Sequence, residues 1–160
     1  MDNGYGQEQY RAKIVLDTSC FMIDSKALIR FRYSLAEVFV ATRVIQELRN
    51  LLKSHKRLTR KKAKDAYRTI FSLGDMVRFE NGGVPYGNSL FKIRQAREYY
   101  FKKRNPDHDI VSLARELLLY SHGPRVYLFT RDDNMYKEAM NRKVIAIKYN
   151  PKNIESMIFI

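Results

Sequence analysis

Three carboxylates stand where short apolar runs end or where helices are expected to begin, and a fourth lies within an expected helix. Asp17 follows the apolar run 13–16, Asp132 comes just after RVYLFT, Glu47 lies in TRVIQELRNLL, and Asp109 opens PDHDIVSLARELLL. Clustered carboxylates repel one another unless a divalent cation neutralises them, and ligand sets made only of oxygen atoms suit Mg²⁺ or Mn²⁺. Such a site activates water and stabilises the charge that builds on a phosphate, so the four acids predict hydrolysis of phosphodiester bonds.

Each acid also has a purely structural interpretation. An Asp at a helix start accepts hydrogen bonds from free backbone amides, which would account for Asp17, Asp109 and Asp132. Glu47 is expected on the apolar side of its helix, where a carboxylate needs a cation, a metal or an edge position, and Arg43 could pair with it. Both interpretations stay open for each residue, although four such acids at the carboxyl ends of strands or facing the sheet would be a coincidence.

Other catalytic centres are excluded by what the sequence lacks. It contains no Gly-rich phosphate loop, no Ser/His/Asp elbow and no CxxC pair. Cys20 is the single cysteine, which rules out an internal disulfide, and His55 and His122 lack metal-ligand spacing. His108 is expected to face solvent between the acids of its helix.

The composition indicates a folded protein with a polyanionic partner. The chain has 160 residues, 45% of them hydrophobic, with 30 Lys and Arg against 17 Asp and Glu and a net charge of +13. We expect residues 1–12 to form a flexible leader and 13–160 a single domain. The charge predicts nucleic acid as the partner and no membrane, because no basic amphipathic segment stands apart. The chain lacks a long apolar run and a signal-peptide core, so an intracellular protein is expected.

Two basic segments carry nearly half of the positive charge. Residues 53–68 hold eight Lys or Arg and residues 92–104 hold six, with three aromatic residues at 99–101. We expect the segments 53–68 and 90–104 to be helical and to bind RNA, because cations neutralise phosphates and rings stack on exposed bases. Solvated helix faces over core aromatics are the alternative interpretation. The candidate RNA-binding residues are Lys53, Lys56, Arg57, Arg60, Lys61, Lys62, Lys92, Arg94, Arg97, Lys102, Lys103 and Arg104.

Short apolar runs alternate with helical patterns along the chain. Strands are expected at 13–16, 38–40, 76–80, 125–129 and 143–147. Helices are expected at 25–33, 43–53, 60–73, 90–103, 107–120 and 132–141, with a turn-rich loop at 81–88. This alternation predicts an α/β fold with a mainly parallel central sheet covered on both faces. Functional sites in such folds lie beyond the carboxyl ends of the strands.

The four acids, taken in order, resemble the pattern of the PIN-domain nucleases. That pattern is matched by Asp17 in VLDTSCFM, Glu47 in VIQEL, Asp109 in DHDIVSLA and Asp132 in LFTRDDNM. The match spans residues 13–147, which is nearly the whole chain. The resemblance implies a small three-layer α/β/α sandwich with a parallel sheet, in agreement with the fold class expected from the strand and helix patterns.

The resemblance also implies roles for the site residues. Asp17, Glu47, Asp109 and Asp132 would hold one or two Mg²⁺ or Mn²⁺ ions for hydrolysis of single-stranded RNA. The hydroxyl groups of Thr130 and of Thr18 or Ser19 would support the site. Asn134 stands where many members carry a further Asp, and Asp107 and Asp133 are neighbours that could take the places of Asp109 and Asp132.

The expected function is therefore that of a metal-dependent endoribonuclease acting on single-stranded or structured precursor RNA. The long basic stretch after Glu47 resembles the PIN nucleases that process ribosomal RNA more than the compact VapC-type toxins. Two alternatives stay open. One is a catalytically inactive RNA-binding scaffold within a ribonucleoprotein, and the other is a toxin that a partner antitoxin neutralises.

Overall fold

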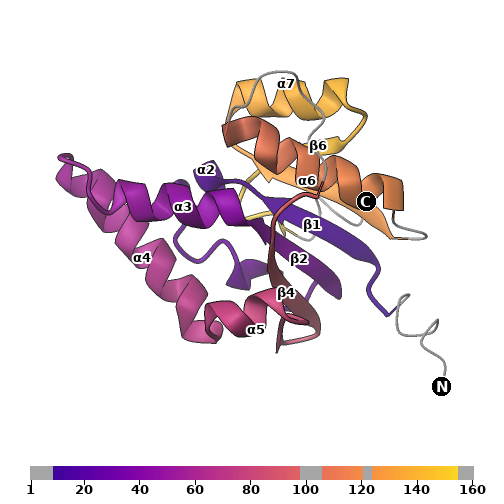
Figure 1. Cartoon of the computed structure of the whole chain (residues 1–160), viewed down its shortest axis with the longest axis horizontal. Helices are drawn as coiled ribbons and strands as arrows, with labels where there is room; N and C mark the ends of the chain where they lie inside the picture. The colour runs from indigo at the N-terminus through magenta and orange to yellow at the C-terminus, as the bar shows by residue number, and fades with distance from the viewer. Residues whose placement is uncertain (1–8, 98–105, 121–123, 155–160) are drawn as a thin grey trace.

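Six strands form one central sheet in the computed structural model, which describes residues 9–97, 106–120 and 124–154 (Figure 1). The strand order is β3-β4-β2-β1-β5-β6, and all neighbours pair in parallel except β3 and β4. The strands are β1 (Ala12–Leu16), β2 (Ala36–Ala41), β3 (Val84–Tyr86), β4 (Ser89–Arg94), β5 (Arg125–Thr130) and β6 (Ile145–Lys148). β1 begins within the expected leader, of which residues 1–8 lie outside the described part.

The helices connect the parallel strands. They are α2 (Thr18–Ile23), α3 (Thr42–Leu51), α4 (Arg57–Leu73), α5 (Met76–Glu80), α6 (Pro106–Tyr120) and α7 (Asp133–Asn141), with a 3₁₀ turn at Ile29–Phe31. This alternation confirms the predicted α/β fold with a mainly parallel sheet and the three-layer α/β/α architecture. None of the helices in the described ranges is long and apolar enough to cross a membrane.

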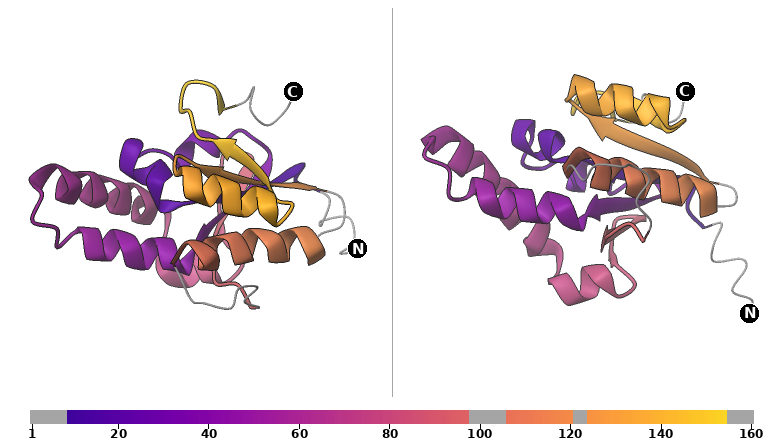
Figure 2. Two further views of the ribbon diagram at one scale, coloured as in Figure 1. Left: turned by 90° about the horizontal axis from the view of Figure 1, so that it is seen from above. Right: turned by 45° about the horizontal axis from the view of Figure 1, so that its top comes forward.

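The direction of the crossovers places helices on both faces of the sheet. The connection from β1 to β2 leads one way along the sheet, whereas the connections from β4 to β5 and from β5 to β6 lead the other way. Because such crossovers are right-handed, α2 lies on one face, and α6 and α7 lie together on the other (Figure 2). The 3₁₀ turn covers the same face as α2, where the Phe31 ring meets the Phe129 ring edge-on at 5.1 Å.

The strand order changes direction at β1, and this determines where a site can form. β1 pairs with β2 on one side and with β5 on the other, with Leu16 opposite both Val40 and Phe129. In parallel sheets, ligands bind beyond the carboxyl ends of the strands at such a switch point. The residues that follow β1 and β5 therefore lie at the place where function is expected.

Two expected elements are wrong in the middle of the chain. Residues 76–80 form the helix α5 and not a strand, because the Asp75 side chain caps its start by accepting a hydrogen bond from the Arg78 backbone amide at 2.9 Å. Residues 89–94 form the strand β4 and not the start of a helix. Their burial alternates with period two, which is the period of a strand.

The neighbouring loop and turn also differ from the expectation. The predicted loop 81–88 contains β3, which joins β4 through a tight turn at Gly87. Gly87 has a φ of 62°, and a Cβ there would lie 2.1 Å from the Arg32 carbonyl oxygen. The predicted helix 25–33 is limited to the 3₁₀ turn and its flanking turns.

Candidate active site

Asp17 lies at the centre of the switch point, directly after β1. Its side chain is 2% exposed, and it caps the start of α2. Oδ1 accepts hydrogen bonds from Ser19 Oγ at 2.6 Å and from the Cys20 backbone amide at 3.2 Å. Oδ2 accepts one from Thr130 Oγ1 at 2.5 Å. Burial raises the pKa of Asp17, and these hydrogen bonds act against that rise by stabilising the carboxylate.

Two hydroxyl groups join the ends of β1 and β5 around this carboxylate. Thr130 Oγ1 donates to Asp17 and accepts from the Asp132 backbone amide at 2.9 Å. Ser19 Oγ donates to Asp17 and accepts from the Arg131 backbone amide at 2.8 Å. Each hydroxyl thus holds Asp17 and the loop after β5 at the same time, a supporting position of the kind expected for both residues.

Glu47 reaches the switch point from α3. It is half-buried, and its Oε1 accepts a hydrogen bond from Thr18 Oγ1 at 2.5 Å. Burial raises the pKa of Glu47, and the nearby charges of Asp107 and Asp17 raise it further. The Arg43 charge lowers this pKa, but no ion pair joins Arg43 to Glu47 within the described ranges. The Glu47 carboxylate is therefore oriented by the Thr18 hydroxyl and not by a cation of the described residues.

Asp107 reaches the same region from the first turn of α6. Burial raises its pKa, and the charges of Asp132 and Asp17 raise it further, whereas His108 lowers it. The charge of Asp107 in turn raises the pKa of Glu47. Asp107 is therefore the carboxylate that is electrostatically coupled to acids on α3, at the end of β1 and before α7.

Asp132 has the capping role that one of its two interpretations predicts. It caps α7, because its Oδ1 accepts hydrogen bonds from the backbone amides of Asn134 at 2.8 Å and Met135 at 3.2 Å. Its Oδ2 accepts no hydrogen bond from the described residues. The cap thus orients the carboxylate while one oxygen remains available. We call Asp17, Glu47, Asp107 and Asp132 the acid group.

Comparison with known families identifies the family of this chain. A family model described as PIN domain matches residues 14–150. The chain belongs to the PIN-domain family. PIN domains are generally nucleases and typically use divalent metals.

The fold of this PIN domain has a counterpart among solved structures. A structure described as a domain of a functionally unknown protein from Methanocaldococcus jannaschii DSM 2661 matches it with a TM-score of 0.52 and 18% identity. The match covers 87% of this chain and 91% of that chain. At this identity the likeness supports the fold alone. Comparison with curated proteins gave no match.

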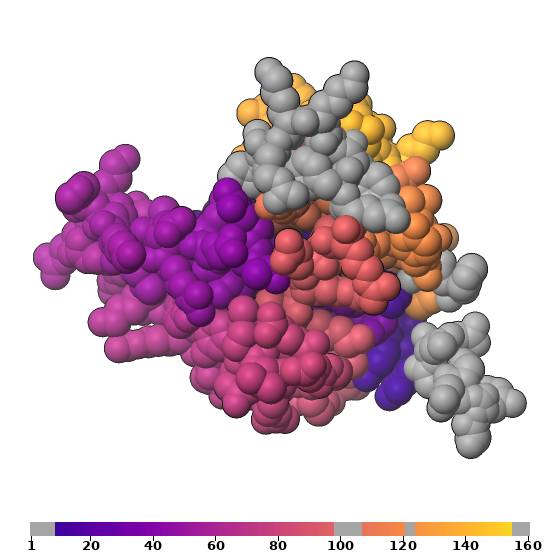
Figure 3. Space-filling view, in the orientation of Figure 1, coloured from indigo at the N-terminus to yellow at the C-terminus, as the bar shows by residue number. Residues whose placement is uncertain are grey.

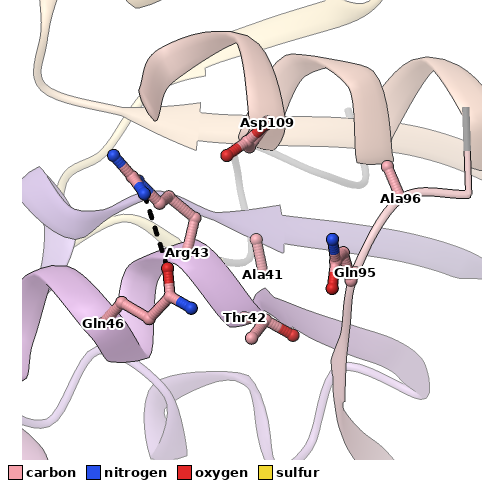
Figure 4. Close-up of a pocket in the computed structure, with 7 residues that line it drawn as sticks. All are labelled: Ala41, Thr42, Arg43, Gln46, Gln95, Ala96 and Asp109. Carbon is pink, nitrogen blue, oxygen red and sulfur yellow. Dashed lines mark hydrogen bonds between the residues drawn. The ribbon is translucent and has the colours of Figure 1, made fainter. Parts of the chain in front are cut away.

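Asp109, the acid expected in α6, is placed elsewhere in the PIN domain. It lines a pocket with Arg43, Gln46 and Gln95, as Figure 4 shows. Residues two apart on a helix are rotated by about 200° about its axis, so the side chains of Asp107 and Asp109 leave α6 in nearly opposite directions. The charges of Asp17 and Asp132 raise the pKa of Asp107, and the charge of Asp107 raises that of Glu47, whereas Asp109 lies at the pocket beside Arg43.

The remaining residues expected near the site lie outside the acid group. Asp133 is exposed and forms an ion pair with Lys148. Asn134 is exposed, and it contributes its backbone amide to Asp132. The sequence interpretation missed Cys20, whose buried thiol donates to Asp17 Oδ1 at 3.4 Å. Its place two residues after Thr18 in the first turn of α2 is the only signal that could have indicated it.

The donor chemistry of the acid group fits a divalent metal. Nowhere in the described part do three or more His, Cys, Asp or Glu side chains lie close enough together to surround an ion. The group nevertheless offers only oxygen ligands, of which Glu47 Oε2 and Asp132 Oδ2 accept no hydrogen bond from described residues. The charges of other members raise the pKa of Glu47 and of Asp107, and a divalent cation would relieve that repulsion.

The basic residues expected to bind RNA fall into different environments. All six of those from 53–68 lie on α4 or in the turn before it, and they are exposed. Figure 3 shows this part of the chain protruding at the left of the molecule. Lys92 on β4 is instead ion-paired with Glu37 at 2.8 Å, and Arg94 on the same strand is half-buried. Arg97 is exposed, and its backbone amide donates to Glu116. Lys102, Lys103 and Arg104 lie outside the described residues.

The hairpin of α3 and α4 extends away from the sheet (Figures 1 and 2). The two helices pack against each other, with Ala63, Ala66 and Ile70 of α4 buried. We call the exposed cations of this hairpin the basic arm; they are Arg49, Lys53, Lys56, Arg57, Arg60, Lys61, Lys62, Lys64 and Arg68. Since Glu47 lies on α3, this helix belongs to both the acid group and the basic arm.

Proposed function

We propose that this PIN domain is a divalent-metal-dependent endoribonuclease that hydrolyses phosphodiester bonds in single-stranded or structured precursor RNA. The observation that carries the proposal is the placement of Asp17 and Asp132 beyond the carboxyl ends of β1 and β5, where the Thr130 hydroxyl connects them and their charges raise the pKa of Asp107. In a basic protein, four like charges gathered at one edge of the sheet are best explained by a bound cation.

The acid group would hold one or two Mg²⁺ or Mn²⁺ ions. When bound, such an ion lowers the pKa of a water molecule and stabilises the charge that develops on the scissile phosphate. Asp17 is fixed by Ser19 and Thr130, so its carboxylate keeps one orientation without an ion. Glu47 and Asp132 each keep one oxygen that accepts no hydrogen bond from the described residues, and these two oxygens are the natural ligands.

The basic arm would bind the RNA backbone. Its cations are exposed on two packed helices, and the net charge of the chain is +13. Phosphate neutralisation gives affinity without sequence preference and a steep dependence on salt. An RNA strand that lies along α3 would therefore pass from the basic arm to the acid group.

A cleavage assay on end-labelled RNA tests the proposal. The parent is expected to cleave internal bonds of an unstructured and a structured RNA in Mn²⁺ or Mg²⁺ and to stop when a chelator is added. Asp17→Asn should lose at least about 100-fold in rate, because even residues that only support metal ligands cost 10- to 100-fold when removed. Glu80→Gln, which removes an exposed carboxylate on α5, is the charge-matched control.

The two alternative functions predict different results in assays of RNA binding, cleavage and growth. A ribonucleoprotein scaffold would bind RNA with a steep salt dependence but cleave it in no divalent metal. A toxin would cleave RNA, arrest growth on expression and be relieved by a co-encoded protein partner. Cleavage by the parent at the same rate as by Asp17→Asn would overturn the proposal.

A further inference from the structure

A polar pocket lies beside the acid group at the carboxyl edge of β2 and β4. It has a volume of about 260 Å³ and is lined by the start of α3, the residues after β4 and Asp109 of α6 (Figure 4). Small-molecule sites for drug-sized ligands are about 300–1,000 Å³. This pocket is below that range, so it suits a fragment the size of a single nucleobase.

The Arg43 side chain carries a hydrogen-bond donor in this pocket that no described residue satisfies. Its Nε is buried and has no hydrogen-bond partner among the described residues. Its Nη1 donates a long hydrogen bond of 3.5 Å to Gln46 Oε1. Figure 4 shows the Asp109 carboxylate pointing toward the guanidinium group, but no ion pair joins the two in the described part. A buried donor without a partner is costly, and a ligand that accepts a hydrogen bond would remove that cost.

The mixture of charges selects the kind of ligand. Arg43 repels a metal ion, and Asp109 repels a free phosphate or carboxylate. The amides of Gln46 and Gln95 add neutral donors and acceptors to the lining. A neutral, planar group with donors and acceptors along its edge matches this lining, and the edge of a nucleobase is such a group.

The pocket and the acid group both include residues of α3 and α6. Arg43 and Glu47 are four residues apart on α3, which places their side chains next to each other on one face. Asp107 and Asp109 both lie in the first turn of α6. A nucleotide whose base occupies the pocket would therefore place its phosphates near the acid group.

We propose that this pocket binds one nucleobase of the substrate beside the cleaved phosphate and that it prefers guanine. The proposal rests on the proposed nuclease function of the acid group. Guanine presents O6 and N7 as acceptors, which are the atoms that Arg contacts most often in nucleic acids. It also carries two adjacent donors, N1–H and N2–H, that one carboxylate accepts together, so Arg43 and Asp109 would read opposite parts of the same base.

NMR titration of the full chain with the four ribonucleoside 5′-monophosphates, without divalent metal, tests the preference. The phosphate is common to all four, so differences in affinity report the base. A good bidentate contact contributes about 1–3 kcal/mol of discrimination. We expect guanosine monophosphate to bind about tenfold more tightly than the others, with shifts at residues 41–46, 95–96 and 109.

Two variants assign the preference to the pocket. Asp109→Asn should remove the preference for guanine. Gln95→Ala, in an exposed position, should reduce this preference, and it replaces Asp109→Asn in the test if that variant fails to fold. Glu80→Gln should retain it. Equal affinities for the four nucleotides, or a guanine preference that survives in Asp109→Asn, would overturn the proposal. Because the titration contains no metal and involves no cleavage, its outcome is independent of whether the acid group proves to be catalytic.

Discussion

Thr130 at the end of β5 donates a hydrogen bond from Oγ1 to Asp17 Oδ2 at the end of β1, over 2.5 Å. The same oxygen accepts from the Asp132 backbone amide at 2.9 Å. One buried hydroxyl thus connects the carboxylate of the first strand to the residue that caps α7. The position of one acid of the group is therefore coupled to that of another through a side chain that carries no charge.

Thr130→Val should destabilise the protein, because it leaves the Asp132 amide without its acceptor and Asp17 without one donor. An unsatisfied buried polar group costs about 1–3 kcal/mol in the free energy of unfolding. Urea unfolding followed by circular dichroism measures the loss. Thr69→Val, which removes a hydroxyl that bonds within α4, is the matched control and should change stability by less than about 0.5 kcal/mol. Equal losses in the two variants would contradict the connecting role of Thr130.

Asp107→Asn should become more stable relative to the parent as the pH rises. Burial and the charges of Asp132 and Asp17 raise the pKa of Asp107 in the folded state. A raised folded pKa gives stability that is present below the unfolded value of about 3.9 and is lost as the pH rises through the folded pKa. Urea unfolding of both proteins from acidic to neutral pH, with chelator present, measures the difference. A difference that does not change with pH would show that Asp107 does not feel the other acids.

Added Mn²⁺ should raise the melting temperature of the parent through its preferential binding to the folded state. The gain is about 2.7 kcal/mol when the metal is present at 100 times its Kd. Glu47→Gln and Asp107→Asn should reduce the shift, whereas Glu80→Gln should not. Differential scanning fluorimetry with and without chelator measures it. A shift of the same size in all four proteins would place the metal outside the acid group.

Lys62→Ala should weaken RNA binding and reduce its dependence on salt. Lys62 is exposed on the basic arm, and each phosphate contact to a single strand contributes about 0.7 to the slope of log K against log salt concentration. Fluorescence anisotropy at several salt concentrations, without divalent metal, measures this slope. Lys152→Ala, an exposed lysine after β6, should leave it unchanged. The basic arm loses its assigned role if the two variants have the same slope.

The fold class could be predicted from the sequence because its strands are apolar runs with clear ends. Residues 36–41 are buried throughout, and the run before Asp17 is nearly so. The strand β4 could not be predicted, because Lys92 and Arg94 extend the charge pattern of the basic segment that follows. Its alternating burial depends on partners far away in the chain, among them Glu37, which pairs with Lys92 on the neighbouring strand.

Three acids of the candidate site could be predicted from the sequence, but the fourth, on α6, could not. Asp17, Glu47 and Asp132 follow from their places after strands or on an apolar helix face. The choice of Asp109 over Asp107 followed the family pattern, whereas the geometry favours Asp107. Asp107 continues the stripe of Ile110, Val111 and Ala114 at helical spacing, and this spacing was a signal that could have indicated it.

The comparison of Asp107→Asn with Asp109→Asn tests the central claim most directly. Both remove one negative charge from the first turn of α6, two residues apart. On an end-labelled RNA without guanine, in Mn²⁺, Asp107→Asn should cleave at least about 100-fold more slowly than the parent. Asp109→Asn should cleave that RNA at the parental rate. If Asp109→Asn abolished cleavage of this substrate while Asp107→Asn retained it, the acid group described above would be wrong.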